Sequence, residues 1–276
     1  MGAFILFSGC DGMKKILLVG GDERIKRLYN ELLERGFNVD TMGVFEGDCG
    51  WPDYTFDAVV LPVPTTRDGK TVYCPDTKRE IPLDIFDRLD SSVLLLCGAY
   101  TPKRVRYTDY CALDDYALLN AVPTAEGAIA EAIARTHYTL WKSRVLVIGA
   151  GRVGRILADR LLGLRADVTV SARKAADFAL LSAHGIPSIH TRDIPTKLCN
   201  FDIIFNTVDA DVLAGCGEQL SQKLVIDLSS KGCMDAKTAA AVGIIKLSAL
   251  PGKVAPDTAG KILTDVISAI LEGENI

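Results

Sequence analysis

A glycine-rich segment in the second half of the chain restricts the fold more than any other feature. It reads GAGRVG over residues 149–154 and lies directly between an apolar run at 144–148 and an amphipathic pattern that continues to 164. Glycines with this spacing permit a tight turn, a close approach of the backbone to a pyrophosphate, and close packing of a helix on a strand. The amino end of the helix then faces the phosphates. The segment therefore predicts a Rossmann unit that binds a dinucleotide, with another nucleotide or a vestigial site as the alternative.

The end of the next strand indicates which dinucleotide binds. The strand at 167–170 is followed by Ser171, Arg173 and Lys174, where NAD sites usually carry an acidic residue for the ribose hydroxyls. A hydroxyl and two cations suit a 2′-phosphate, so we expect NADP rather than NAD. The turns after two later strands belong on the same edge of the sheet and complete the predicted cofactor site. The other predicted contacts are Gly149, Ala150, Gly151, Arg152, Val153, Gly154, Asn206, Thr207, Val208 and Ser229.

Short apolar runs alternate with helical patterns along the chain, which is typical of βαβ units around a parallel sheet. We expect strands at 15–19, 37–42, 57–61, 93–96, 144–148, 167–170, 202–206 and 224–227, and a first helix at 22–35. Gly20 and Gly21 follow the first strand without a third spaced glycine, so we interpret them as a tight turn with Asp22 as a helix cap.

The predicted fold class is α/β: two Rossmann-like parallel-sheet domains with a cleft between them, linked by a long helix, with the C-terminal helix packing back on the first domain. The expected segments are an extension or cloning remnant at 1–12, in which a lipidated Cys10 is the lesser alternative, an α/β substrate domain at 13–120, a linking helix at 121–141, an NADP-binding domain at 142–252, and a loop and helix at 253–276. In the last segment, Asp257 or Thr258 is expected to cap the helix.

Candidate substrate residues lie at strand ends and helix starts. Thr65 and Thr66 follow two prolines after a strand, and an ordinary turn is the alternative. Thr124 is expected to cap the linking helix, and Glu126 is expected in its first turn. The alternative for Glu126 is that it only stabilises the helix dipole and does not bind substrate. Lys231 and Lys253 lie in loops, where a lysine either faces solvent or holds a substrate carboxylate. Glu126 and Lys231 are also the candidate catalytic groups.

Composition excludes several classes of protein. The chain of 276 residues has 31 basic and 35 acidic residues, a net charge of -4 and no basic tract, which argues against nucleic-acid binding. No apolar run reaches the length that spans a membrane, and no secretion signal is evident, so we expect a cytoplasmic protein. The eight cysteines form no CxxC pair, and we expect neither a metal site nor disulfides.

Several motifs together resemble one family. The segments NAVPTAEG at 120–127, GAGRVG at 149–154, VSARK at 170–174, DLSS at 227–230 and LPGKVAPDTAGKIL at 250–263 are similar to those of the A subunit of bacterial dipicolinate synthase. The resemblance extends over residues 14–271 and includes GGD at 20–22 and LPVPTT at 61–66.

This resemblance implies an NADP-dependent oxidoreductase that acts with a flavoprotein-like B subunit in the mother cell of sporulating bacteria. The pair would form dipicolinate, which is pyridine-2,6-dicarboxylate, from an intermediate of the dihydrodipicolinate pathway. The chain departs from the family pattern at Lys231 and Gly232, where an Arg-Pro pair is common. The three histidines, His137, His184 and His190, do not provide the C-terminal histidine that a 2-hydroxyacid dehydrogenase needs. The alternatives are an NADP-binding regulatory or redox-sensing module and another NADP-dependent dehydrogenase of a small carboxylic acid, and a homo-oligomer stays open.

Overall fold

The computed structural model describes residues 14–48, 50–52, 55–103 and 106–273. The predicted extension at 1–12, with Cys10, lies outside the described residues. The chain divides into a first unit, Met1–Asn120 with Ala255–Ile276, and a second unit, Ala121–Val254. The assignment of substrate binding to one unit and cofactor binding to the other stays a prediction.

The first unit is built on a five-stranded parallel sheet in the order β2-β1-β3-β4-β5. The strands are β1 (Lys15–Val19), β2 (Asn38–Met42), β3 (Ala58–Val60), β4 (Leu94–Cys97) and β5 (Tyr107–Asp109). The first four match the predicted strands within two residues at each end. The edge strand β5 was not predicted because its residues are polar or exposed and show no apolar run.

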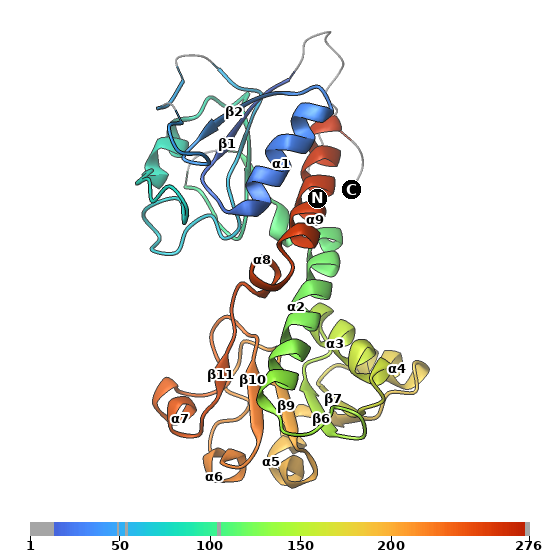
Figure 1. The fold of residues 1–276 in the computed structure, drawn as a ribbon. Coiled ribbons are helices and arrows are strands. Elements are labelled where there is room, and N and C mark those ends of the chain that lie inside the picture. Colours follow the sequence, from blue (N-terminus) through green and yellow to red (C-terminus); the bar gives the residue numbers. More distant parts are fainter. Residues whose placement is uncertain (1–13, 49, 53–54, 104–105, 274–276) are drawn as a thin grey trace. The chain divides into compact units, whose positions relative to one another are not determined.

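Helices cover one face of this sheet, and loop segments with a 3-10 helix cover the other. The helical elements of the unit are α1 (Glu23–Glu34), η1 (Leu83–Arg88), η2 (Tyr110–Ala112), the first residues of α2 (Asp114–Arg135) up to Asn120, and α9 (Pro256–Glu272). The side chain of Asp22 caps α1 by accepting from the Arg24 N–H, as predicted. Helices α1 and α9 lie side by side (Figure 1) and bury apolar residues in one core with the sheet. The C-terminal helix therefore packs back on the first sheet, as predicted.

The predicted linking helix needs correction at both ends. Helix α2 (Asp114–Arg135) begins earlier than 121, because the two aspartates of its first turn stabilise the amino end and Pro123 lies inside the helix. It ends before 141, since the Thr136 hydroxyl donates to the carbonyl of Tyr138 and the chain turns. Trp141 is therefore outside the helix and 56% exposed.

The second unit contains a six-stranded parallel sheet in the order β11-β10-β9-β6-β7-β8. Its strands are β6 (Arg144–Ile148), β7 (Asp167–Ala172), β8 (Ser188–His190), β9 (Ile203–Asn206), β10 (Leu224–Asp227) and β11 (Ile245–Lys246). Three strands run to each side from the centre, which is the strand order of dinucleotide-binding Rossmann domains. The prediction of a Rossmann unit is confirmed.

Helices connect the strands of the second sheet, and α8 follows its last strand. They are α3 (Arg152–Gly163), α4 (Ala175–Ala183), η3 (Thr191–Asp193), α5 (Ile194–Lys197), η4 (Leu198–Asn200), α6 (Gly217–Leu220), α7 (Ala236–Ala241) and α8 (Leu250–Val254). The expected loop at 253 onward is largely helical, because its prolines occupy first turns, with Pro256 beginning α9. The predicted cap at Asp257 or Thr258 is wrong: both lie inside α9, and Ala255 is the N-cap residue without a side-chain bond.

Candidate functional site

The glycine loop after β6 is packed so tightly that two of its glycines have no room for a side chain. Gly149 adopts φ +104, and a Cβ there would lie 2.5 Å from Val208 Cγ1. A Cβ on Gly154 would lie 1.9 Å from the carbonyl oxygen of Gly149. These contacts require glycine for the turn and for the close packing of α3 against it, which are the roles predicted from their spacing.

The middle glycine of the loop faces open space instead. Nothing lies within 4 Å of a Cβ built on Gly151, which is the N-cap residue of α3 and has no side-chain capping bond. Ala150 is buried, whereas Arg152 is exposed and Val153 is half-buried in the first turn of the helix. The amino end of α3 thus presents backbone N–H groups beside an open position, an arrangement that fits a pyrophosphate.

The residues at the end of β7 and directly after it differ in their exposure. Ser171 is fully buried, and the Thr191 hydroxyl lies 3.5 Å from its hydroxyl, so its side chain lies inside the protein. Arg173 and Lys174 are both exposed directly after the strand. Asp177, in the first turn of α4, accepts from Arg155 Nη2 at 2.7 Å. The exposed charged side chains at this strand end are therefore those of Arg173 and Lys174. The nearby carboxylate of Asp177 is already paired with Arg155.

Two of the predicted contacts at the end of β9 use their side chains inside the protein. The amide Nδ2 of the buried Asn206 donates to the carbonyl of Val208 at 2.9 Å and to Asp227 at 2.8 Å. The Thr207 hydroxyl donates to the carbonyl of Ile148 at 2.8 Å. These groups shape the turn beside the glycine loop. Their direct contact with a cofactor stays a prediction.

A buried polar network at the ends of β10 and β11 joins Asn206 and Ser229, both predicted as cofactor contacts, to Asp227 and Lys246, which were not predicted. Asp227, 2% exposed, accepts from the Ser229 hydroxyl at 2.7 Å, and Lys246 Nζ lies 3.0 Å from its other oxygen. Burial alone raises the pKa of Asp227, but hydrogen bonds from Ser229, Asn206 and Lys246 outweigh burial and hold that pKa below its ordinary value. The only signal in the sequence was the position of these residues at strand ends.

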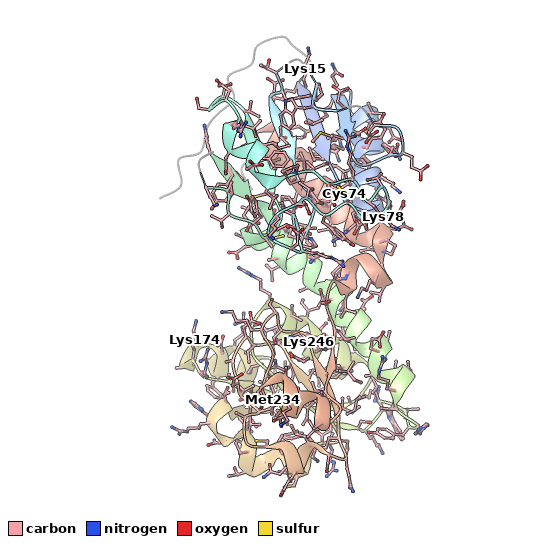
Figure 2. All side chains as sticks on the ribbon, turned by 90° about the vertical axis from the view of Figure 1, so that its left-hand side faces the viewer. Lys15, Cys74, Lys78, Lys174, Met234 and Lys246 are labelled. Atoms are coloured by element: carbon pink, nitrogen blue, oxygen red, sulfur yellow. The ribbon has the colours of Figure 1, made fainter. Side chains whose placement is uncertain are left out.

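Lys231 lies on a turn that Asp209 holds. The Asp209 carboxylate accepts from the backbone N–H groups of Ser230 and Lys231, the latter at 2.9 Å. Lys231 itself is exposed. Figure 2 shows Lys174 and Lys246 at the same end of the second unit, which is where parallel strands end. The predicted cofactor residues after β6, β7, β9 and β10 therefore share one edge of this sheet.

The two threonines proposed for substrate binding are engaged in their own loop. Thr65 is fully buried, and its hydroxyl donates to the carbonyl of Pro62 and accepts from the Gly98 N–H, each at 3.0 Å. The Thr66 hydroxyl donates to Asp68 at 3.0 Å and accepts from the Gly69 N–H. Hydrogen bonds from the backbone and side chains of this loop, led by that of the Thr71 N–H, lower the pKa of Asp68. Both hydroxyls thus stabilise turns.

The residues of the PTAEG segment lie in the interior of α2 rather than at its start. Thr124 is therefore not a cap and Glu126 is not in the first turn, which corrects both predictions. The carboxylate of Glu126 accepts from Arg160 Nε at 3.3 Å across to α3. A Cβ on Gly127 would lie 2.8 Å from Val254, so the PTAEG and LPGKV segments are in contact. Lys253 is exposed in the last turn of α8.

The turn after β1 provides no second phosphate site. The Gly21 N–H donates to the carbonyl of Tyr73 at 2.7 Å, and a Cβ on Gly20 would lie 2.8 Å from Cys74 Sγ. Figure 2 shows Cys74 well away from Lys15, which begins β1. The loop that follows β3 therefore covers the carboxyl end of β1, as the interpretation of Gly20 and Gly21 as a tight turn requires.

Metal clusters and membrane-spanning helices are both absent from the described residues. Within residues 14–273, apart from the short gaps, no three His, Cys, Asp or Glu side chains gather in a way that would hold a metal ion. No helix in the same part of the chain combines the length and the apolar character needed to span a membrane.

Comparison with known proteins connects both units to one family. The family model for the N-terminal domain of the dipicolinate synthase A subunit matches residues 15–116, and a model for putative NAD(P)-binding matches residues 138–226. The A subunit of dipicolinate synthase from Bacillus subtilis (strain 168) is 32% identical over 284 residues, covering 93% of this chain and 95% of that protein. The second unit thus contains an NAD(P)-binding domain.

Solved structures agree with these matches. The dipicolinate synthase A subunit from Bacillus halodurans has a TM-score of 0.84 at 30% identity, covering 95% of this chain and 99% of that one. The corresponding chain of dipicolinate synthase from Bacillus subtilis has the same TM-score and identity, with 95% and 96% covered. D-lactate dehydrogenase from Escherichia coli, at a TM-score of 0.59 and 13% identity over 95% and 98% of the two chains, shares the fold.

Proposed function

This chain belongs to the family of dipicolinate synthase A subunits, and from that membership we propose that it is an NADP-dependent oxidoreductase subunit that forms dipicolinate. The substrate is a small dicarboxylic acid, an intermediate of the dihydrodipicolinate pathway. A flavoprotein-like B subunit is the partner, and the cytoplasm of a sporulating mother cell is the proposed location. The observation that carries the proposal is the glycine loop, with Gly151 open beside the amino end of α3 and cations after β7.

The preference for NADP rests on charge at one place in the second unit. Arg173 and Lys174 are exposed where β7 ends, and Asp177 is paired with Arg155. A 2′-phosphate requires cations at this position, whereas NAD requires a carboxylate that accepts from the ribose hydroxyls. The residues present therefore fit NADP, with the glycines of the loop shaping it for the pyrophosphate.

The proposed reaction makes few demands on acid and base groups of the chain. Oxidation of a partly unsaturated six-membered ring gives an aromatic pyridine, and NADP, when bound, supplies the hydride acceptor. The protein must hold the substrate ring in a fixed orientation toward the cofactor and allow the released proton to reach solvent. Lys231 and Glu126 stay the candidate groups for this task, since both are exposed on the second unit.

The test supplies the fresh product of the lysine-route synthase together with NADP, with and without the B subunit. Dipicolinate absorbance and NADPH are followed in the same sample. We expect both products to appear in a one-to-one ratio and to depend on this chain. Dipicolinate without NADPH would mean oxidation by dissolved oxygen and would overturn the hydride transfer. NADP binding without turnover in the presence of the B subunit would favour a regulatory module instead.

A further inference from the structure

An ion pair joins the beginnings of two neighbouring helices in the second unit. Nη2 of Arg155, near the start of α3, donates to Oδ1 of Asp177, in the first turn of α4, at 2.7 Å. The side chain of Asp177 is 21% exposed, and that of Arg155 is 45% exposed. The carboxylate is thus mostly covered and has Arg155 as its counterion.

The pair lies at the edge of the sheet where the cofactor residues are predicted. Strands β6 and β7 are parallel neighbours, with Ile148 opposite Ser171 near their carboxyl ends. Helix α3 follows β6 and helix α4 follows β7, so both helices begin at this edge. Dinucleotides bind outside the carboxyl ends of such strands. The pair therefore connects the helix that follows the glycine loop with the segment that follows β7.

Asp177 lies one helical turn beyond the cations that follow β7. Its N–H donates to the carbonyl of Lys174 at 3.1 Å, and Arg173 directly precedes Lys174. It is the one acidic residue in the segment 171–177. A carboxylate beside the predicted position of a 2′-phosphate repels it, whereas a carboxylate after this strand suits the ribose hydroxyls of NAD. The segment thus contains charges that suit either nucleotide, and Arg155 cancels the one that would favour NAD.

We propose that Arg155 is a positioning residue for cofactor selectivity and that it acts through Asp177. The inference rests on the proposed function for NADP as the ligand. Arg155 neutralises the Asp177 carboxylate and keeps it in the pair, so that Arg173 and Lys174 meet the 2′-phosphate without an opposing charge. Because solvent screens partly exposed charges, the contribution is moderate and appears in the choice between the two nucleotides.

The test measures the dissociation constants of NADP and NAD by fluorescence titration at about 50 mM salt, where surface charges are only partly screened. For Arg155→Met, we expect NADP to bind about threefold to tenfold more weakly, because the carboxylate loses its counterion. For Asp177→Asn, we expect NADP to bind about threefold to tenfold more tightly, because the opposing charge is gone. The affinity for NAD should not fall in either variant, since NAD has no 2′-phosphate.

The double variant distinguishes an action through Asp177 from direct contact with the cofactor. If Arg155 acts by neutralising Asp177, combining Arg155→Met with Asp177→Asn should restore the wild-type affinity for NADP, because both charges are then absent. An affinity as low as that of Arg155→Met alone would mean that Arg155 itself binds the phosphate, and would overturn the proposed role.

The matched control is Arg144→Met. Nη2 of Arg144 lies 2.5 Å from Oδ1 of Asp202, and the two side chains are 52% and 34% exposed. Arg144 begins β6, so this pair lies at the opposite edge of the same sheet. Its loss should change neither dissociation constant. A change as large as that in Arg155→Met would overturn the local role of the Arg155 pair.

Two further results would overturn the inference. One is wild-type selectivity in both single variants, and the other is an equal loss of affinity for both nucleotides in Arg155→Met. If Arg155→Met melts far below the wild type, Asp177→Asn decides, because it keeps every cation, and wild-type affinity for NADP in that variant would overturn the role. Failure of the proposed function is recognised separately, in the wild type alone, as NADP binding no tighter than NAD or as a reaction without NADPH.

Discussion

Lys246 Nζ lies 3.0 Å from Oδ2 of Asp227, and this contact joins the carboxyl ends of β11 and β10. Asp227 also accepts from Ser229 and Asn206, so a single buried carboxylate holds the turns that border the predicted cofactor site. The side chain of Lys246 is 41% exposed, whereas that of Asp227 is 3% exposed. Removal of the lysine therefore leaves a buried charge with only neutral partners.

For Lys246→Met, we expect the free energy of unfolding to fall by about 1–2 kcal/mol, less than for a fully buried pair because solvent screens the exposed lysine. Urea unfolding followed by circular dichroism measures the change. The control is Lys237→Met, which removes an exposed lysine of α7. Equal stability of the two variants would contradict a stabilising role for the Lys246 contact.

The same carboxylate predicts a dependence of stability on pH. The pKa of Asp227 is lower in the folded protein than in the unfolded chain, where it is about 3.9. Its contribution to stability is therefore complete above that value and is lost as the pH falls through the folded pKa. We expect Asp227→Asn to be less stable than the wild type at pH 7, with a smaller loss of stability as the pH is lowered from about 5 to about 3. Parallel pH curves for the two proteins would contradict this prediction.

The glycines of the loop are expected to respond differently to alanine. Gly151→Ala adds a Cβ to open space, so the thermal midpoint should stay unchanged while NADP affinity falls, since the methyl group fills the space that a pyrophosphate needs. Gly154→Ala places a Cβ against the Gly149 carbonyl and should lower the free energy of unfolding by about 1–3 kcal/mol or more. Calorimetry with NADP and thermal melts of both variants give the two readouts. NADP binding by Gly151→Ala at wild-type affinity would show that the loop does not contact the cofactor.

Charge reversal after β7 tests the choice of cofactor. We expect Arg173→Asp to weaken NADP binding by about tenfold or more and to leave NAD binding nearly unchanged, because only NADP carries the 2′-phosphate. Fluorescence titration with each nucleotide measures both constants. Lys237→Asp reverses a charge on α7 and should change neither. An equal loss for both nucleotides, or no loss, would mean that Arg173 does not select NADP.

The cysteines should differ in reactivity. Burial, together with Asp109, raises the pKa of Cys97 and of Cys111 to about 12, whereas Cys199 is exposed. Since the thiolate is the reactive form, iodoacetamide at about pH 8 should modify Cys199 first among these three, and the other two only after unfolding in urea. Peptide mass spectrometry identifies the modified positions. Rapid modification of Cys97 in the native protein would show that the first unit opens easily.

Much of the fold follows from local patterns along the chain. The apolar run at β6 and the spacing of Gly149, Gly151 and Gly154 predicted a strand, a turn and a helix in order, because each depends on neighbouring residues. The ends of α2 were predicted wrongly because local patterns do not show how the helix packs against the rest of the protein. Pro123 is of a type that usually begins a helix, but the two aspartates before it and packing of the preceding turns extend α2 toward the amino end.

The sequence by itself determined the Rossmann unit, the order of its strands along the chain and the cations after β7. Only the tertiary structure decided which polar groups stay open to a ligand. Thr65 and Asn206 were plausible binding residues, yet the Gly98 N–H and the Asp227 carboxylate use their side chains. Lys246 became a partner of Asp227 only through the pairing of β10 with β11, which no local pattern marks. Hydrogen bonds between distant segments decide whether a polar side chain is still available to a ligand, and the local sequence does not show these bonds.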